Sequence, residues 1–364
     1  MADRRTERFA ALVAALRAAH LDGLLLTSLP NIRYLTGFSG SSAIAVATER
    51  ELLFVTDFRY ATPVRDEVGD LARISIESQS LWNGVWRLMP ELAGGSLEVV
   101  GFESAHLLHR DFERLLGAGS RWQWRPTVDL VETLRERKDD EEIARITAAA
   151  GVAERALRRT VDAVREGQTE LAIAGLLERP LREEGSAGFP FETIVASGER
   201  AALPHARAAS RPVRRGDFLL IDFGAIVDGY CSDITRTFVV GRADSEQRAV
   251  HDIVRGANEL ASAQVHAGMT GRDADAIARR YIEERGYGEE FGHSLGHGIG
   301  LEVHEAPRLA RTADATLPER AVVTIEPGVY RAGWGGVRVE DDVVLRRDGA
   351  TTITAFPREL LEIG

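Results

Sequence analysis

The order of hydrophobic and polar residues along the first third of the chain is typical of a small α/β domain. Apolar residues recur at helical spacing between residues 7 and 20, and three apolar runs, LLLT, AIAV and LLFVT, then follow with the length and composition of strands. Helical and strand-like segments continue to alternate up to RWQWRPTVDLVE, where Pro126 interrupts the pattern. We therefore expect an α/β domain over residues 1–131.

A different arrangement is expected over residues 132–364, beginning with a long amphipathic helix. The run KDDEE places acidic residues where a helix N-terminus favours them. Two more helices are predicted after Ser245 and Thr270, ending near Gly268 and Gly286, with runs rich in Val, Ile and Phe between and after them. This part of the chain is therefore predicted to be α+β, with extensive antiparallel hairpins. The apolar positions of the first helix recur at spacings of three and four: Ile143, Ile146, Ala150, Ala153, Leu157, Val161 and Val164.

Length and charge narrow the class of protein. A chain of 364 residues exceeds the ~250–300 residues at which a single core usually stops growing, which favours two domains. Its 45 Lys+Arg and 56 Asp+Glu give a formal charge of −11, spread along the sequence, so a nucleic-acid partner is not expected. No stretch approaches ~20 consecutive apolar residues, and the N-terminal residues lack the apolar run of a signal peptide. We expect a cytoplasmic protein without a membrane span.

Two residue types are each present only once, and both exclude a kind of chemistry. Cys231 is the only cysteine, so neither an intrachain disulfide nor a cysteine-rich zinc site is expected. Lys138 is the only lysine, and it lies in the charged run RERKDDEE, whereas covalent lysine catalysis favours a desolvated side chain. We therefore expect no covalent catalysis by lysine.

A hairpin predicted over FLLIDFGAIVDGYCSDITRTFVV carries two aspartates on one face. The dipeptide Asp228-Gly229 suits a two-residue type I′ turn. With that turn, Asp222 lies opposite Thr235 and is a diagonal neighbour of Asp233, roughly 7–8 Å away. Two metal ions roughly 3.5–4 Å apart would fit between these carboxylates. Surface positions are the alternative, but the apolar neighbours favour burial, and a buried carboxylate needs a partner.

Histidines and glutamates follow downstream in strand-like segments. The runs AVVTIEPGVY and GGVRVEDDVVL place Glu326 and Glu340 where a strand would carry apolar residues; a surface Arg–Glu pair is the alternative for the second. The run GHSLGHGIGLEVHE holds His293, His297 and His304, and its four glycines disfavour a helix. Its glycines are expected to let the backbone pass close to metals and substrate. Carboxylates and imidazole without cysteine suit manganese, cobalt, iron or zinc.

The ordered set of two aspartates, one histidine and two glutamates resembles the metal ligands of the M24-type "pita-bread" metallopeptidases, which include methionine aminopeptidase, aminopeptidase P and prolidase. The resemblance lies in IDFGAIVDGYCSDITRTF, GHGIGLEVHEAP, TIEPGVY and GGVRVEDDV, and it covers the second domain. NIRYLTGFSGSSA and TDFRY are similar to the creatinase-type N-terminal domain of aminopeptidase P. Methionine aminopeptidases lack that domain, and creatinase lacks the metal ligands. The resemblance thus implies a creatinase-like α/β domain followed by an α+β pita-bread catalytic domain.

The resemblance also implies two divalent metal ions and a set of ligands for them. Manganese is the expected metal, with cobalt, zinc or iron as alternatives. By this likeness Asp233 and Glu340 bridge the two ions, Asp222 completes one site, and His297 and Glu326 complete the other. Glu326 is in addition the expected general base, which later returns its proton to the leaving amine.

Five further residues receive roles only through the resemblance. His293 and His304 are expected to hydrogen-bond the substrate and the tetrahedral intermediate, and His205 to line the pocket for proline. Arg338 matches an arginine beside the second glutamate, and Tyr330 matches a tyrosine of the site.

These expectations combine into a predicted activity on peptides that begin with Xaa-Pro. The first expectation is an aminopeptidase P, which removes the N-terminal residue when proline stands second. The alternative is a prolidase, which cleaves only Xaa-Pro dipeptides and needs a cation to hold the free proline carboxylate. A non-enzymatic binding protein on the same fold is a third hypothesis, disfavoured because all five metal ligands are present. A homodimer is expected from the resemblance.

Overall fold

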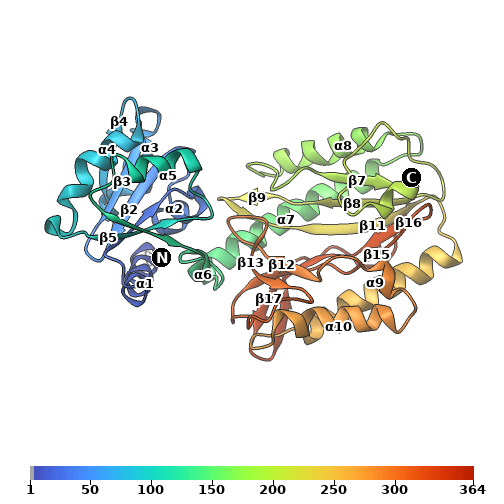
Figure 1. Ribbon diagram of the computed structural model, residues 1–364. Helices are drawn as coiled ribbons and strands as arrows, with labels where there is room; N and C mark the ends of the chain where they lie inside the picture. Colours follow the sequence, from blue (N-terminus) through green and yellow to red (C-terminus); the bar gives the residue numbers. More distant parts are fainter. Residues whose placement is uncertain (1–3) are drawn as a thin grey trace. The chain divides into compact units, whose positions relative to one another are not determined.

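A computed structural model describes residues 4–364 and divides the chain into two compact units, the first ending at Arg135 and the second spanning Glu136–Gly364 (Figure 1). The division follows the short helix α6 (Glu132–Arg135), a few residues after the boundary expected from the sequence. Asn31 explains why α6 belongs to the first unit. Its side chain accepts a hydrogen bond from Arg135 (2.7 Å) and donates one to Glu132 (2.6 Å).

The first unit is a six-stranded mixed sheet with helices packed on it, in the order β4-β3-β2-β1-β5-β6. The expected α/β character is confirmed. One hydrophobic cluster lies between the sheet and α4 and α5, and includes Trp82, Val85 and Leu115. The strands are β1 (Gly23–Leu26), β2 (Ala43–Thr48), β3 (Leu52–Asp57), β4 (Arg73–Glu77), β5 (Val99–Glu103) and β6 (Gln123–Thr127). The helices are α1 (Arg4–Ala18), α2 (Leu29–Thr36), α3 (Pro63–Glu67), α4 (Leu81–Leu88) and α5 (His109–Leu116).

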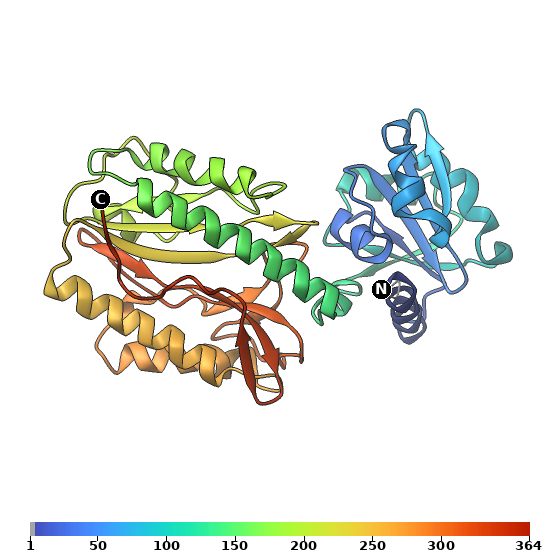
Figure 2. The same cartoon turned by 180° about the vertical axis from the view of Figure 1, so that it is seen from behind.

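The second unit places antiparallel strands between two pairs of helices (Figure 2). Helices α7 (Asp140–Ala163) and α8 (Glu170–Glu183) pack on the sheet β19-β11-β8-β7, and α9 (Ser245–Gln264) and α10 (Gly271–Glu283) cover the other side. The first sheet contains β7 (Ile194–Ser197), β8 (Phe218–Phe223), β11 (Ile234–Val240) and β19 (Glu362–Ile363). A five-stranded sheet contains β12 (Gly296–Gly298), β13 (Glu305–Leu309), β14 (Val322–Ile325), β17 (Asp341–Arg346) and β18 (Gly349–Thr352). Two short hairpins are β9 (Ile226–Val227) with β10 (Tyr230–Cys231) and β15 (Gly328–Arg331) with β16 (Gly335–Arg338).

Three of the four long helices in this unit begin where the sequence predicts them. Helix α7 starts after Asp139, which forms a capping box with Glu142, and α9 starts after a second capping box. Helix α8 is not anticipated by the sequence pattern, because Pro180 and Gly175 within it weaken the helical signal. Burial of its apolar face against the sheet compensates for that low propensity.

The environment of Lys138 differs from the expectation. Its side chain is only 1% exposed and forms an ion pair with Glu305, so the inference that it is solvated is wrong. The surrounding charged run misled the sequence argument, since a charged residue can be buried when it is paired.

Among residues 4–364, no helix is long and apolar enough to cross a membrane.

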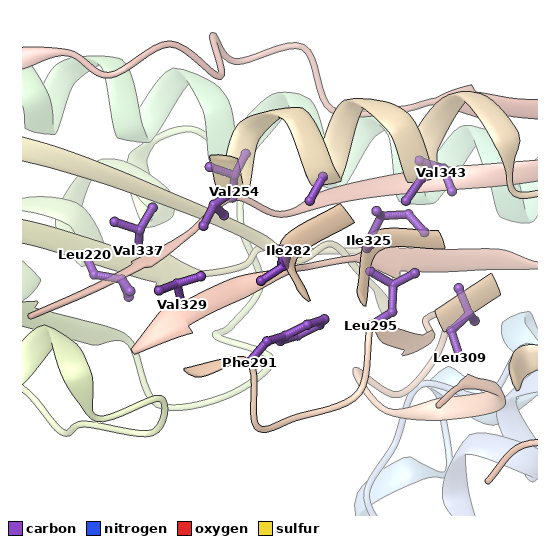
Figure 3. Close-up of a cluster of buried hydrophobic side chains, with 14 of the residues drawn as sticks. Leu220, Val254, Ile282, Phe291, Leu295, Leu309, Ile325, Val329, Val337 and Val343 are labelled. Carbon is purple, nitrogen blue, oxygen red and sulfur yellow. The ribbon is translucent and has the colours of Figure 1, made fainter. Parts of the chain in front are cut away.

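A hydrophobic cluster between α9, α10 and the strands fixes the backbone around the histidines and glutamates (Figure 3). Leu295 lies between His293 and His297 in sequence and is fully buried in this cluster. Ile325 and Val339, also fully buried, immediately precede Glu326 and Glu340. Close packing of these apolar side chains therefore restricts the positions of the polar residues next to them.

Candidate active site

The hairpin of β8 and β11 has the register expected from its turn. Asp222 lies opposite Thr235, and both Asp228 and Gly229 have positive φ angles, 48° and 80°, as a type I′ turn requires. Gly224, in the same hairpin, allows two backbone segments to approach each other. A Cβ atom there would lie 1.9 Å from the carbonyl oxygen of Ser232, so the glycine permits close backbone contact.

Both aspartates of this hairpin are buried, with 8% of Asp222 and 4% of Asp233 exposed, which excludes surface positions. One oxygen of Asp222 accepts a hydrogen bond from Arg338, while the backbone N–H of Asp233 donates to Asp342. The Oδ1 atoms of both aspartates are buried without a hydrogen-bond partner among the described residues. A buried, unpaired carboxylate oxygen is costly, so these atoms fit a site that binds cations.

His297 directs one ring nitrogen toward the carboxylates. Its Nδ1 lies 3.0 Å from the carbonyl oxygen of Gly298, which assigns the proton to Nδ1 and leaves Nε2 as an acceptor. Nε2 lies 3.5 Å from Glu326 Oε1 and 3.9 Å from Asp233 Oδ2. Ligand atoms of Asp233, His297 and Glu340 all lie within 4.8 Å of one another. Three expected ligands therefore converge on one point.

The two glutamates stand at the ends of strands and are held by threonines. Glu326 follows the last residue of β14 and accepts a hydrogen bond from Thr324 (3.2 Å). Glu340 accepts one from Thr235 (2.5 Å) and is only 2% exposed. The alternative of a surface Arg–Glu pair for Glu340 is therefore wrong.

Packing of carboxylates in a buried site changes their protonation. Burial raises the pKa of Asp233 and Glu340 well above the usual range, and neighbouring carboxylates raise it further. Burial raises the pKa of Glu326 to about 8, with opposition from Arg338 and reinforcement from Asp222. Divalent cations would compensate this negative charge, and oxygen donors with one imidazole suit them. The residues present therefore fit the metal ions expected from the sequence.

Arg338, Tyr330 and His293 form a chain of hydrogen bonds. Arg338 donates to the Tyr330 hydroxyl (2.7 Å), and that hydroxyl lies 2.9 Å from His293 Nε2. His293 Nδ1 lies 2.8 Å from the carbonyl of Ser294, so Nδ1 carries the proton and Nε2 accepts from Tyr330. Burial lowers the pKa of His293 to about 4 and raises that of Tyr330 to about 12. In this arrangement the Nε2 of His293 is engaged by tyrosine.

His304 and His205 lie at the exposed edge of the site. The His304 ring is 4.4 Å from the His297 ring, in an edge-on arrangement. Burial lowers the pKa of His304, and Arg308 and His205 contribute to the same effect. Arg338 donates a hydrogen bond to the carbonyl of Pro204 (3.4 Å), the residue before His205, so the loop borders the same site. The structure therefore brings all three histidines of GHSLGHGIGLEVHE and His205 into one region.

A buried glutamate holds the loop that carries His205. The carboxylate of Glu170 accepts hydrogen bonds from the backbone and hydroxyl of Ser197, from Arg200 and from the backbone of Ala209. These partners flank His205 on both sides in the sequence. No signal in the sequence identifies Glu170, because its partners are assembled by the fold.

Two further residues of the site were missed by sequence reasoning. Thr235 donates to Glu340 and accepts from Arg338 Nε (3.0 Å), and its predicted position opposite Asp222 was the available signal. Arg308 lies opposite His297 in the pairing of β12 with β13. Side chains of directly opposed residues share a face of the sheet, so Arg308 adds a cation to the histidine side of the site. No pattern near Arg308 in the sequence reveals this pairing.

The comparison with protein families agrees with this geometry. Residues 144–347 match metallopeptidase family M24, and residues 8–137 match the creatinase/prolidase N-terminal domain. The chain belongs to metallopeptidase family M24. This confirms the creatinase-like and pita-bread architecture, and it makes the protein a peptidase that uses divalent metal. The hypothesis of a non-enzymatic binding protein is not supported.

Several relatives are similar to this M24 peptidase over nearly the whole chain. It is 34% identical over 343 residues to an Xaa-Pro dipeptidase from Pyrococcus horikoshii, covering 94% of this chain and 95% of that one. The solved structure of an Xaa-Pro dipeptidase from Bacillus anthracis has a TM-score of 0.94 and 38% identity, covering 99% and 100% of the two chains. An X-Pro aminopeptidase from Thermotoga maritima has a TM-score of 0.89 and 38% identity, covering 98% and 99%.

Proposed function

We propose that this M24 peptidase is an Xaa-Pro dipeptidase that uses two divalent metal ions, manganese being the first to test. Sequence reasoning favoured an aminopeptidase P and kept the dipeptidase as the alternative. Relatives named Xaa-Pro dipeptidase, similar over more than nine-tenths of the chain, support the alternative better. An X-Pro aminopeptidase remains the second candidate, because the Thermotoga maritima structure is similar at the same sequence identity.

The observation that carries the dipeptidase proposal is the position of Arg308. An Xaa-Pro dipeptide ends in a free carboxylate one residue beyond the scissile bond, and a guanidinium binds a carboxylate through two parallel hydrogen bonds. Arg308 is exposed and lies opposite His297, and its charge lowers the pKa of both His297 and His304. Its position and charge support Arg308 as the cation that would bind the free carboxylate, which the sequence alone did not identify.

The carboxylate cluster supplies the proposed metal ligands. Asp233 and Glu340 would be shared by both ions, Asp222 would belong to one site, and His297 and Glu326 to the other. Divalent ions in such a site supply an activated water and polarise the scissile carbonyl.

The protein's own side chains would move the protons. Glu326 accepts the proton of the attacking water and passes it to the proline nitrogen, which carries no hydrogen in a peptide bond and must gain one to leave. His304, at the exposed edge beside His297, donates a hydrogen bond to the oxygen that becomes negatively charged. His293 is held by Tyr330 and Arg338, which fixes its ring at the wall of the site.

Hydrolysis of paired substrates tests the proposal. Purified protein loaded in turn with manganese, cobalt, zinc or iron is assayed with Xaa-Pro dipeptides and with Xaa-Pro-Yaa tripeptides. We expect a preference for dipeptides, and Arg308→Gln is expected to raise their KM by about 10- to 100-fold, since it removes a charged hydrogen bond of roughly 1.5–3 kcal/mol. Arg347→Gln, on an exposed arginine paired with Glu319, is the control. Efficient tripeptide cleavage that is insensitive to Arg308→Gln would favour the aminopeptidase.

We also propose that the protein forms a homodimer, as the likeness of its first domain to the creatinase type suggests. Light scattering coupled to gel filtration tests this directly. A mass equal to one chain of 39.8 kDa at micromolar concentration would contradict it.

A further inference from the structure

The only lysine of the chain makes a buried ion pair beside the active site. Lys138 Nζ lies 3.1 Å from Glu305 Oε2, and the two side chains are 1% and 6% exposed. Removing a charge from water is costly, so a buried pair implies that both partners are closely held. This pair connects the beginning of the second unit to the beginning of strand β13.

The carboxylate of Glu305 also organises the residues that precede it. Its Oε1 accepts a hydrogen bond from the backbone N–H of Glu302 (3.0 Å). The same carboxylate lies over Gly300, where an added Cβ atom would be only 2.8 Å from Oε2. Gly300 therefore leaves space for this carboxylate, and the segment 300–305 closes on itself around the Glu305 side chain.

His304 is the functional residue of that segment. Residues 301–304 form bends without strand pairing, so no backbone ladder fixes the position of His304. The His304 ring lies at the edge of the His297 ring, and His304 directly precedes Glu305 in the sequence. The Glu305 backbone pairs with Gly298 at the start of β13, and the Glu305 side chain adds a second anchor next to His304 through Lys138 and the backbone of Glu302.

Lys138 is itself held by backbone contacts at both sides of its peptide. Its N–H donates to the carbonyl of Arg320 (3.1 Å), and its carbonyl accepts from the Arg320 side chain (2.7 Å). Because its backbone is anchored in this way, Lys138 presents its ammonium to Glu305 from a fixed position. A small displacement of a catalytic group is known to cost a large part of the rate, so such anchoring is relevant to turnover.

We infer that Lys138 is a positioning residue, which acts through Glu305 to hold His304 in place for the reaction. The inference rests on the proposed function only in assigning His304 a contact with the substrate. It does not depend on whether dipeptides or longer peptides are cleaved.

The kinetic test replaces each partner by an uncharged residue of similar size. Lys138→Met and Glu305→Gln are each expected to lower kcat about 10- to 100-fold on whichever Xaa-Pro substrate the wild type cleaves, with KM changed less. Lys138→Arg, which keeps the charge, is expected to recover a substantial part of kcat. An unchanged kcat in a folded Lys138→Met protein would overturn the inference.

A double-variant comparison separates positioning from general support of the fold. In a His304→Ala background, Lys138→Met is expected to lower kcat no further, because the group that it positions is absent. A full additional loss in that background would show that Lys138 acts on the fold instead. Lys138→Met combined with Glu305→Gln removes both buried charges, so thermal stability is expected to recover while kcat stays low.

A spectroscopic measurement tests the inference without any assay of activity. Imidazole signals in long-range ¹H–¹⁵N spectra of the protein are assigned for His304 with the His304→Ala variant. Lys138→Met is expected to shift or broaden the His304 signal and to leave that of His251, in helix α9, unchanged. If the wild type cleaves no Xaa-Pro substrate but its His304 signal still depends on Lys138, the proposed function is contradicted and the positioning role is not. A His304 signal that is identical in wild type and Lys138→Met would overturn the positioning role.

Discussion

Thr235 is the residue on which the aspartate and glutamate halves of the site meet. One hydroxyl donates to Glu340 and accepts from Arg338, whose guanidinium also binds Asp222. Outer partners of this kind orient metal ligands and influence metal affinity. The sequence placed Thr235 correctly opposite Asp222 but gave it no role, because strand register does not reveal what a hydroxyl reaches.

Replacing this hydroxyl is expected to weaken metal binding. Thr235→Val keeps the shape of the side chain and is expected to lower manganese affinity roughly 10- to 100-fold, since Glu340 loses its donor. Thr235→Ser, which keeps the hydroxyl, is the matched control and should bind nearly as the wild type does. Titration calorimetry measures both variants. Equal affinity in wild type and Thr235→Val would show that this hydrogen bond does not orient Glu340.

His251 in α9 makes stability depend on pH independently of the active site. It is 1% exposed, and burial lowers its pKa from 6.5 to about 4; Asp252 opposes this by a smaller amount, and Arg255 and Arg236 lower the pKa further. The stability that the neutral, buried imidazole contributes is fully present above pH 6.5. It is lost as the pH falls from 6.5 toward 4, because the unfolded chain binds the proton first.

A glutamine at this position is expected to remove that part of the acid sensitivity. Between pH 7.5 and pH 5, metal-free wild type is expected to lose about 2 kcal/mol more free energy of unfolding than metal-free His251→Gln. Urea unfolding at the two pH values measures the difference. The same loss in both proteins would mean that burial does not disfavour the charged imidazole.

At the scale of elements, helix α9 connects the ends of the two strands that carry the glutamates. The Asn258 amide, fully buried, donates to the carbonyls of Ile325 (2.8 Å) and Val339 (3.1 Å). Each of these residues directly precedes a glutamate of the site. One amide thus supports the spacing of Glu326 and Glu340, together with the pairing of Ile325 with Asp341 between β14 and β17.

Loss of this amide is expected to affect both stability and metal binding. Asn258→Leu leaves two buried carbonyls without a donor, which is expected to cost on the order of 2 kcal/mol or more in free energy of unfolding. Manganese affinity should fall as well, because both glutamates lose their common support. Ser262→Ala, one turn further along the same buried face, is the control and should change neither quantity appreciably. Chemical unfolding with calorimetric titration decides between these outcomes.

The glycines of the histidine-rich segment also act at the level of elements. They were expected to let the chain pass close to metals and substrate. A Cβ atom at Gly296 would instead lie 1.9 Å from the carbonyl of Thr324, and one at Gly298 would lie 2.2 Å from that of Ala306. These glycines are required because neighbouring strands approach closely, and the sequence could not distinguish the two reasons.

For the whole molecule, the cluster of carboxylates is expected to make stability depend on bound metal. Buried carboxylates with raised pKa values repel one another, and divalent ions relieve that repulsion. Chelation is therefore expected to lower the melting temperature, and manganese at 100 times its Kd should restore about 2.7 kcal/mol. Differential scanning calorimetry with and without chelator tests this. Glu340→Gln is expected to show a smaller effect, and a melting temperature independent of metal in the wild type would contradict the prediction.

The sequence by itself determined most of the elements of this protein and predicted which types of side chain would bind metal. Hydrophobic periodicity and caps located α7, α9 and α10, and the Asp228-Gly229 turn fixed the register that places Asp222 opposite Thr235. These signals are local, because helix period, capping and turn geometry involve residues close together in the chain.

Only the tertiary structure decided which distant residues support the site. Asn258, Arg308 and the Lys138–Glu305 pair act across separations that no local pattern encodes. Lys138 shows the reason most directly: its neighbours in sequence are charged, and its neighbours in space bury it. Burial and pairing are properties of the folded surroundings, so the sequence fixes which side chains are available, while packing decides which of them meet.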